Sequence, residues 1–369
     1  MYRHTAPPGD VLSDTAPLPE EEHPASNRHA RGHHSLTDSE PGIPPSVLAA
    51  AAGVRKAMVV PVVTALAIGT LFVAVYLAAF HAPSVRHQPL GIAASDKVAA
   101  STELALSDAA PDAYTFHRYA NTAAAREAIK HDEVPAVLVA GKNGGRPVLL
   151  VAGAQGPSTL SSLTTAVSKA VGTQVKVQDI DPLTPQDARG LSVFYASFGV
   201  VLAGFLFAVS SYSIAPRMVL SGRVASMGIF SLAIGLAVAL IAHTAFGALP
   251  AAFVTVATIA TLLAAATAAA AGVLMRLFGP LGMPVSSVVL LILGNATSGG
   301  VLPTSYLPGW LAPLSHFMAP AAAVRALRGA AYFDSVHLVG SLAVLASWPV
   351  VCLAVQYAMD RAAARRRPA

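Results

Sequence analysis

The stretch Leu191–Ile214, LSVFYASFGVVLAGFLFAVSSYSI, holds no charged residue. A helix needs about 20 apolar residues to cross the hydrocarbon core of a bilayer, and this stretch is long enough. Working outward, one similar stretch precedes it and four follow it. The other predicted spans are Met58–Phe80, Met227–Ala248, Ala251–Met275, Gly282–Val301 and Leu338–Met359. The sequence therefore predicts an α-helical polytopic membrane protein with six spans.

The composition supports a membrane protein. Hydrophobic residues make up 54% of the chain and charged residues only 12%, whereas a soluble domain has about 25% charged residues. After residue 190 the chain has nine arginines but only two acids, Asp334 and Asp360. The net charge of +5 is thus largely an excess of arginine near the spans. No basic stripe runs through a predicted folded region, so we expect no nucleic-acid partner.

The positive charges predict the orientation. With six spans, one side of the membrane carries Arg55, Lys56, Arg217, Arg223, Arg276, Arg361 and Arg365–Arg367. Cytoplasmic loops are enriched in lysine and arginine, so both termini are expected in the cytoplasm and the protein in the cell (plasma) membrane. Residues 81–190 and 302–337 would then be extracytoplasmic. Arg325 and Arg328, in the second of these segments, count mildly against this orientation.

The 81–190 segment has the mixed composition of a folded domain. Alternation and helical periodicity predict its elements, with Asn121 as an N-cap. They are strand Thr115–Tyr119, helix Thr122–His131, strand Pro135–Ala140, strand Arg146–Ala152, helix Ser158–Val171 and strand Gln174–Asp179. This βαββαβ order predicts an α/β ferredoxin-like extracytoplasmic domain. Residues 81–112 lead into it, with room for an additional strand around Leu90–Ala94.

Other segments complete the expected organisation. Residues 1–45 are polar and proline-rich, which is typical of a disordered cytoplasmic tail. Residues 46–80 predict an interfacial helix leading into the first span. Residues 191–359 would form a five-helix bundle interrupted by an outer segment at 302–334. Residues 360–369 would be a basic cytoplasmic tail.

The chain lacks the motifs of an energy-coupled enzyme. It contains no G-x-x-x-x-G-K-[ST] phosphate loop, and no acid or lysine lies inside a predicted span. We expect no catalytic activity, no cofactor and no metal site. Two polar side chains stand out within the spans, His243 and Asn295. His243 is either a functional titrating group or a histidine bonded across helices or near the outer interface, and Asn295 indicates a helix–helix hydrogen bond.

Two amphipathic stretches flank the bundle. Ala215–Met227, with Arg217, Met218 and Arg223, is either an interfacial segment that receives force from a partner or a plain loop with orienting charges. Pro320–Phe333 predicts an amphipathic outer helix that places Arg325 and Arg328 on one face. These two arginines would contact lipid phosphates or an anionic substrate, or simply anchor the helix at the interface.

The layout resembles the permeases of type-2 ABC exporters, in the branch similar to the phage-infection-protein (YhgE/Pip) group. The likeness covers about residues 50–360: one span, a large insert and five further spans. Locally it rests on AREAI…VPAVLV (125–139), GLSVFYASFGVVLAG (190–204), and LPGW (307–310) followed by RALRGAAY (325–332). The long N-terminal segment departs from the usual pattern.

The resemblance implies a function and partners. It implies a homo- or heterodimer of permeases that exports a substrate and is driven by a separate cytoplasmic P-loop ATPase. Ala215–Met227 would be the ATPase-facing link and Pro320–Phe333 the outer-gate helix. The main alternative is a non-transporting surface receptor or envelope-assembly scaffold that acts through residues 81–190.

Overall fold

The computed structural model describes residues 45–81, 84–141 and 145–365. The pattern of contacts separates the described residues up to Lys56 from those that begin at Ala57. The predicted disordered tail lies outside the described residues except for Pro45, which begins a helix. The predicted C-terminal tail is helical as far as Arg365, and the last four residues lie outside the description.

Five helices in the described part of the chain are long and apolar enough to cross a membrane. The first is Met58–Phe80, the greater part of α1 (Pro45–Phe80). The others are α5 (Ser192–Ile214), α6 (Leu220–Ala239) continued by a π-helix (Leu240–Ala245), a run from Phe253 to Ala296, and α12 (Leu338–Arg365). The protein is therefore a membrane-embedded, mostly helical chain, as the hydropathy predicts. The run 253–296 covers most of two of the predicted spans, Ala251–Met275 and Gly282–Val301.

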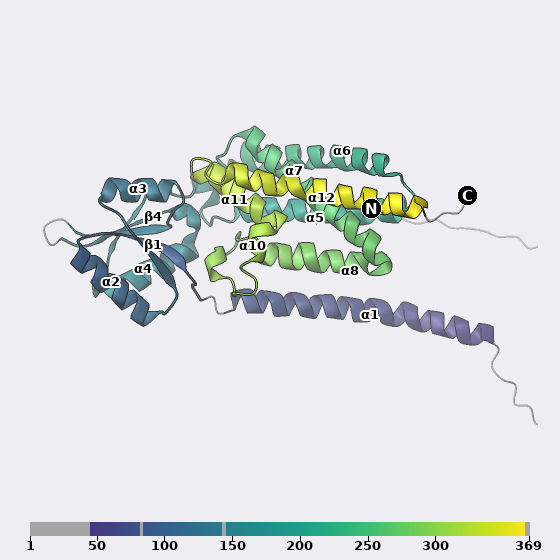
Figure 1. Cartoon of the computed structure of the whole chain (residues 1–369), viewed down its shortest axis with the longest axis horizontal. Coiled ribbons are helices and arrows are strands. Elements are labelled where there is room, and N and C mark those ends of the chain that lie inside the picture. The colour runs from purple at the N-terminus through teal and green to yellow at the C-terminus, as the bar shows by residue number, and fades with distance from the viewer. Residues whose placement is uncertain (1–44, 82–83, 142–144, 366–369) are drawn as a thin grey trace, which may run out of the picture. The chain divides into compact units, whose positions relative to one another are not determined.

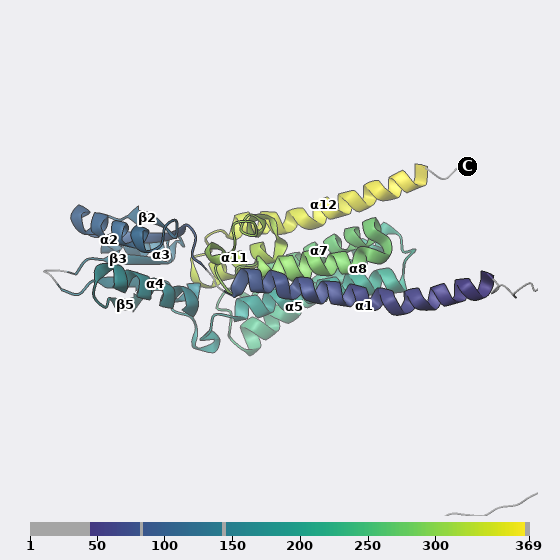
Figure 2. The ribbon, with the colours of Figure 1, turned by 90° about the horizontal axis from the view of Figure 1, so that it is seen from below.

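That run is not a single straight helix. α7 (Phe253–Phe278) ends at Gly279, whose φ of +52° is available to glycine at little cost. After a 3-10 turn (Gly279–Leu281) the chain continues as α8 (Gly282–Ser286), a π-helix (Ser287–Leu293) and α9 (Gly294–Ala296). A methyl group at Gly282 would lie 2.4 Å from the Met275 Cα. The chain therefore reverses at Gly279 and packs closely back against α7, as Figures 1 and 2 show.

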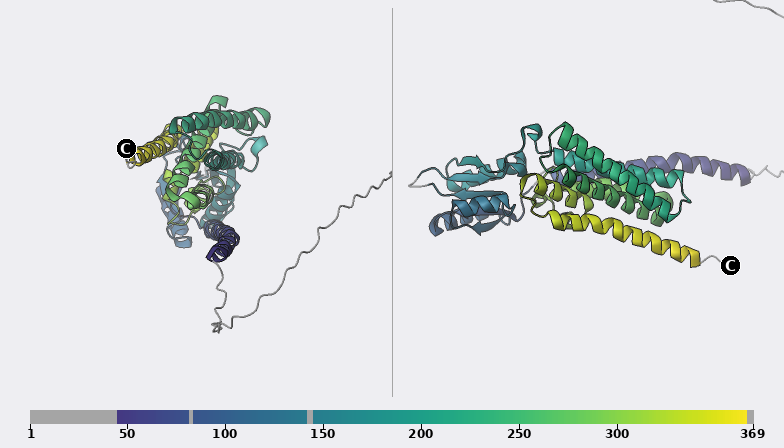
Figure 3. Two further views of the ribbon diagram at one scale, coloured as in Figure 1. Left: turned by 90° about the vertical axis from the view of Figure 1, so that its right-hand side faces the viewer. Right: turned by 90° about the horizontal axis from the view of Figure 1, so that it is seen from above.

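Helix α7 is the centre of the bundle, because α5, α6, α11 and α12 all pack against it. Small residues allow this close approach. A Cβ at Gly204 of α5 would lie 3.0 Å from the Thr267 side chain, and one at Gly235 of α6 would lie 2.0 Å from the Thr261 hydroxyl. In contrast, α6 and α12 lie at the surface of the bundle (Figure 3, right), and α12 diverges from α7 toward its C-terminal end (Figure 2).

The segment before α12 is folded over the end of the bundle. It contains a 3-10 turn (Thr304–Tyr306), α10 (Leu314–Phe317) and α11 (Ala319–Tyr332). α11 confirms the predicted amphipathic helix at Pro320–Phe333. The Gly294–Gly300 stretch, α9 and the non-helical residues 297–300 that follow it, is buried throughout.

The α/β domain (residues 88–179) contains a five-stranded mixed sheet. Its elements are β1 (Gln88–Ala93), α2 (Asp96–Ala109), β2 (Tyr114–Arg118), α3 (Thr122–Lys130), β3 (Ala136–Val139), β4 (Val148–Val151), α4 (Pro157–Val171) and β5 (Lys176–Asp179). The strand order is β2-β1-β3-β4-β5. Only the β3–β4 pair is antiparallel.

The ferredoxin-like prediction is wrong in its strand pairing. The βαββαβ elements occur in the predicted order from β2 to β5, but β1 is inserted between β2 and β3. β1 is buried along nearly its whole length, so it takes a central position. Gly91 permits this because a Cβ there would lie 2.6 Å from a methyl group of Val137 on β3. The central position of β1, QPLGIA, thus changes the strand order of the sheet.

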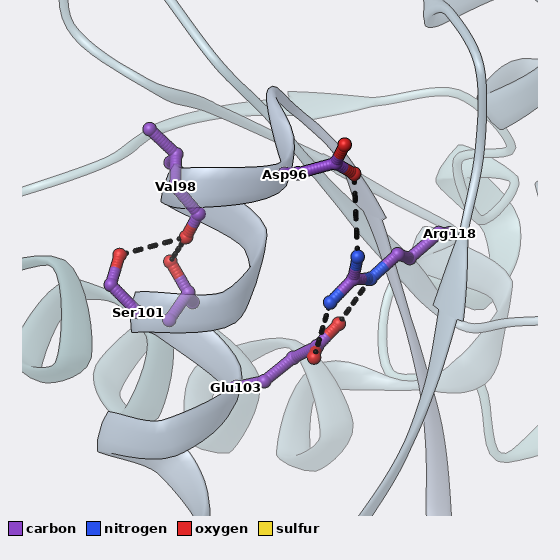
Figure 4. A network of polar contacts seen from close by, with 6 residues as sticks. Asp96, Val98, Ser101, Glu103 and Arg118 are labelled. Atoms are coloured by element: carbon purple, nitrogen blue, oxygen red, sulfur yellow. Dashed lines mark hydrogen bonds and ion pairs between the residues drawn. The ribbon is translucent and has the colours of Figure 1, made fainter.

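Helices cover both faces of the sheet. α3 packs on one face and α2 and α4 on the other (Figure 1). Asn121 caps α3 as predicted, because its side chain accepts a hydrogen bond of 2.9 Å from the Ala124 N–H. Arg118 joins edge strand β2 to α2 through two 2.9 Å hydrogen bonds to Glu103 and a 3.4 Å contact with Asp96 (Figure 4). These ion pairs lie at the surface, so they contribute only modestly to stability.

Candidate functional site

The segment that joins α5 to α6 is shorter than predicted. α6 begins at Leu220, so only residues 215–219 are non-helical, and we call them the α5–α6 link. The prediction of an interfacial segment over Ala215–Met227 is therefore wrong for its second half. Val219, in extended conformation, precedes the first turn of α6. Arg217 and Met218 are exposed on the link, whereas Arg223 is buried in α6.

Arg223 fixes the link to the end of α5. Its Nη2 donates hydrogen bonds to the carbonyl oxygens of Ala215 at 2.6 Å and Pro216 at 3.1 Å. Its Nη1 donates to the Ser211 hydroxyl at 3.3 Å. The guanidinium also lies 3.8 Å from the centroid of the Tyr212 ring, a cation–π contact. The buried arginine thus bonds the carbonyl oxygens of Ala215 and Pro216, which directly follow the C-terminal end of α5; the Ala215 oxygen also accepts from the Met218 N–H at 3.1 Å.

This polar cluster extends into α7 and α12. The Tyr212 hydroxyl donates to Gln356 Oε1 at 3.1 Å, and Gln356 Nε2 donates to the Ala269 carbonyl oxygen at 3.2 Å. Arg276 forms an ion pair with Asp360. Four helices are therefore joined at the end of the bundle that carries the α5–α6 link.

A cavity of about 520 Å³ opens beside this cluster. Its wall combines apolar and charged side chains: Tyr212, Pro216, Arg217, Met218, Val219, Leu220, Arg223, Arg276 and Asp360. Arg217 and Met218 are exposed at its edge, while Arg223 and the Arg276–Asp360 pair are held in place by hydrogen bonds. The depression thus combines an exposed cation, Arg217, with apolar side chains.

Arg325 and Arg328 both lie on α11 and point into the protein. Arg325 Nη1 donates to the Ser315 carbonyl oxygen at 2.7 Å, and Arg328 Nη1 donates to the Gly299 carbonyl oxygen at 3.3 Å. Burial lowers the pKa of the Arg328 guanidinium, and the nearby carboxylate of Asp132 opposes that shift. The two arginines therefore join α11 to α10 and to the non-helical backbone at Gly299, a role that the sequence did not indicate.

His243 and Asn295 make local hydrogen bonds. His243 lies in the π-helix after α6, and its Nδ1 is 3.1 Å from the Leu249 carbonyl oxygen in the following loop. Asn295 is buried, and its Nδ2 donates to the Leu291 carbonyl oxygen one turn earlier at 3.0 Å. The predicted helix–helix hydrogen bond of Asn295 is therefore not the one observed.

The sequence did not reveal a junction between α11 and the α/β domain. Phe333, directly after α11, is fully buried in the core on the α3 side of the sheet, beside Ala125 and Ile129. Asp132, after α3, accepts a hydrogen bond from Gln155 and lies near Arg328. A single aromatic residue at a helix end carries no sequence signal for such a contact. This junction joins α11 to the α/β domain.

Two of the acidic residues before α5, Asp187 and Asp179, accept backbone hydrogen bonds. Asp187 is buried and accepts hydrogen bonds from the backbone N–H groups of Leu191 and Ser192 at 3.0 and 3.1 Å. Asp179 accepts one from the Gly153 N–H at 2.8 Å. Among the described residues, no group of three or more histidine, cysteine or acidic residues is arranged to hold a metal ion.

Comparison with known proteins adds no relative. No protein-family model, curated protein or solved structure matches the chain.

Proposed function

We propose that this protein is the membrane permease subunit of an ABC-type exporter, which moves an amphipathic or hydrophobic substrate out of the cell and is energised by a separate P-loop ATPase. The observation that carries the proposal is the α5–α6 link. Arg217 and Met218 are exposed there, and Arg223 fixes the link to α5 and its neighbours. The link has only five residues and is hydrogen-bonded to Arg223 of α6. A partner that binds its exposed residues would therefore move α5 and α6 together.

The proposal includes six crossings of the membrane. The run 253–296 reverses at Gly279, so it supplies two antiparallel segments. The second, Gly282–Ala296, is shorter than the roughly 20 residues that a full crossing needs. Its end at Gly294–Gly300 is buried in protein, which makes a short crossing tolerable. With six crossings, both termini and the α5–α6 link are cytoplasmic and residues 81–190 are extracytoplasmic.

The helices offer a route for coupling. α5 and α12 are joined at one end by the Tyr212–Gln356 hydrogen bond. At the other end, Asp187 accepts hydrogen bonds from the N–H groups of Leu191 and Ser192 at the start of α5, and α12 follows the loop after Phe333. Rigid helices with fixed ends transmit displacement between sites. Movement at the link would therefore reach α11 and the α/β domain, and α11 would act as the outer gate.

The alternative is a surface receptor or scaffold that works through the α/β domain alone. That domain has its own hydrophobic cores on both faces of its sheet. However, Phe333 belongs to one of those cores. The α/β domain thus needs a residue that follows α11 to complete its core. This favours a domain that moves with the bundle over an independent domain that is merely anchored by it.

A pull-down from native membranes in mild detergent, with mass spectrometry of the partners, tests the proposal. We expect a P-loop ATPase to co-purify in stoichiometric amount. The same pull-down is then done with Arg217→Glu, and with Arg217→Lys as the charge-conserving control. Only the glutamate variant should lose the ATPase, because Arg217 is exposed and its replacement leaves the Arg223 contacts intact. A well-folded preparation without any ATPase would contradict the proposal. Gel filtration of the same preparation tests the expected permease dimer.

A further inference from the structure

A second cavity, of about 440 Å³, lies between α5 and α6 at the end of the bundle next to the α/β domain. Its volume falls within the range of about 300–1,000 Å³ that is typical of small-molecule sites. Its walls are Ser192, Tyr195, Ala196 and Gly199 of α5, Val238 of α6, Ile241 and Ala242 of the π-helix, and the flanking Gln186, Phe246 and Ala248. No charged side chain belongs to this wall.

The packing of the two helices explains the cavity. α5 and α6 both approach α7 closely through glycines, Gly204 and Gly235. Nearer the α/β domain, small residues face the space between α5 and α6, and a Cβ at Gly199 would meet no heavy atom within 4 Å. Here α6 also changes to a π-helix, a feature that is often found at functional sites. The gap is thus produced by the sequence of both helices.

The walls are fixed by hydrogen bonds that need no ligand. Asp187 holds the first residues of α5 through the N–H groups of Leu191 and Ser192. His243 Nδ1 lies 3.1 Å from the Leu249 carbonyl oxygen, which fixes the loop after the π-helix. A Cβ at Gly247 would lie 3.9 Å from Gln186 Cγ, so this loop and the turn before α5 meet at one end of the cavity. The cavity is therefore preformed.

We propose that this cavity binds the acyl chain of a membrane lipid. Both walls belong to helices that are apolar enough to span the membrane, so the cavity faces hydrocarbon. A large apolar cavity does not hold ordered water, because its lining offers too few polar partners. Its polar lining residues are Gln186, before α5, and Ser192 and Tyr195 in the first turn of α5, and an ester or head group would sit beside them. Because no lining residue is charged, binding depends on the acyl chain of the lipid and not on the charge of its head group.

Photolabelling tests the proposal without any ATPase, so its outcome is independent of the proposed transport function. The purified full-length protein is reconstituted in phosphatidylcholine vesicles that contain a phospholipid with a diazirine on one acyl chain. After illumination, we expect the label to concentrate on peptides that contain Ala196 and Ile241. The same labelling with a phosphatidylglycerol probe should give the same sites and yield.

Gly199→Leu is the test variant, because its side chain would project into empty space without a clash. Gly228→Leu is the matched control on α6. A Cβ at Gly228 also meets no atom within 4 Å, but Gly228 does not line the cavity. The leucine side chain would displace about two methylene groups of the acyl chain from the cavity. Their lost burial corresponds to a roughly tenfold weaker binding, so Gly199→Leu should reduce labelling roughly tenfold. Gly228→Leu should leave it unchanged.

Two results would overturn the proposal. One is labelling spread evenly over all lipid-facing helices and insensitive to Gly199→Leu, which means ordinary annular lipid. The other is disulfide cross-linking between two copies through a Tyr195→Cys substitution, with no lipid label at Ala196. A second copy of the chain would then fill the space. Thermal unfolding of each variant confirms that the labelling comes from folded protein.

Discussion

The Arg223 guanidinium lies 3.8 Å from the centre of the Tyr212 ring and donates three hydrogen bonds to the end of α5. Tyr212 in turn bonds Gln356 on α12. One cation therefore joins the α5–α6 link to three helices. The exposed Arg217 lies only six positions earlier and has a different role. The two arginines can be separated experimentally, which distinguishes the structural support of the link from its contact with a partner.

Arg223→Ala should lower the free energy of unfolding by roughly 2–4 kcal/mol, because it removes charge-assisted hydrogen bonds to Ala215, Pro216 and Ser211. Cys352 is the only cysteine of the chain and is buried, so a thiol-reactive dye reports unfolding directly. Arg217→Ala is the control and should leave the melting curve unchanged. Equal melting temperatures for the two variants would contradict the supporting role of Arg223.

Gly235→Ala should destabilise the bundle strongly, whereas Gly228→Ala on the same helix should be neutral or slightly stabilising. A Cβ at Gly235 would lie 2.0 Å from the Thr261 hydroxyl and 2.8 Å from the Ala257 carbonyl oxygen, while one at Gly228 meets nothing within 4 Å. Alanine is favoured over glycine in a helix by about 1 kcal/mol where space allows. The same dye assay compares the two. Similar stability of both variants would show that α6 does not pack on α7 as described.

Phe333→Ala should loosen the α/β domain as well as α11. Phe333 is fully buried, and truncation of such a residue costs about 3–5 kcal/mol. Hydrogen exchange should rise in α3 and β3, which contact it. Phe317→Ala is the control, because Phe317 is 70% exposed. Faster exchange confined to α11 would mean that the junction does not join the two parts.

Asp132 should give the protein a pH-dependent stability. Burial raises the pKa of Asp132 above its usual value of 3.8, although His337, Arg328 and Gln155 partly oppose the shift. The folded state then binds the proton more tightly than the unfolded state. The free energy of unfolding therefore falls as the pH rises from 3.8 through the raised pKa, and is constant above it.

Asp132→Asn should remove that part of the pH dependence and tolerate the local φ of +55°. Asp112→Asn is the matched control, since Asp112 also has a positive φ but is exposed. Denaturation at a series of pH values measures the slope. An unchanged slope in the Asp132 variant would contradict the assignment. Burial also raises the pKa of Asp181, so a smaller slope of the same sign should persist.

Much of the fold could be predicted from local patterns. Uncharged runs gave the membrane helices, and Asn121 gave the start of α3, because hydropathy and capping depend on neighbouring residues. The position of β1 could not be predicted, since strand pairing depends on residues distant in sequence. The burial of Arg223 was also hidden. A loop arginine that orients the chain and one that supports two carbonyl groups look alike in sequence.

The candidate sites follow the same division. The α11 helix and its arginines were found from periodicity, but the partners of Arg325 and Arg328 are backbone carbonyls of Ser315 and Gly299. Backbone groups leave no mark on composition. The lipid cavity was also hidden, because an unfilled space depends on the separation of two helices and not on any motif.

Cross-linking from Met218 in native membranes tests the central claim most directly. A photoreactive amino acid replaces Met218 on the α5–α6 link, and a second variant carries it at Leu104, which is 63% exposed on the α/β domain. The account predicts a cross-link to a P-loop ATPase from position 218 and none from position 104. Capture of the ATPase from position 104, or no ATPase from position 218 in protein shown to be folded, would contradict it.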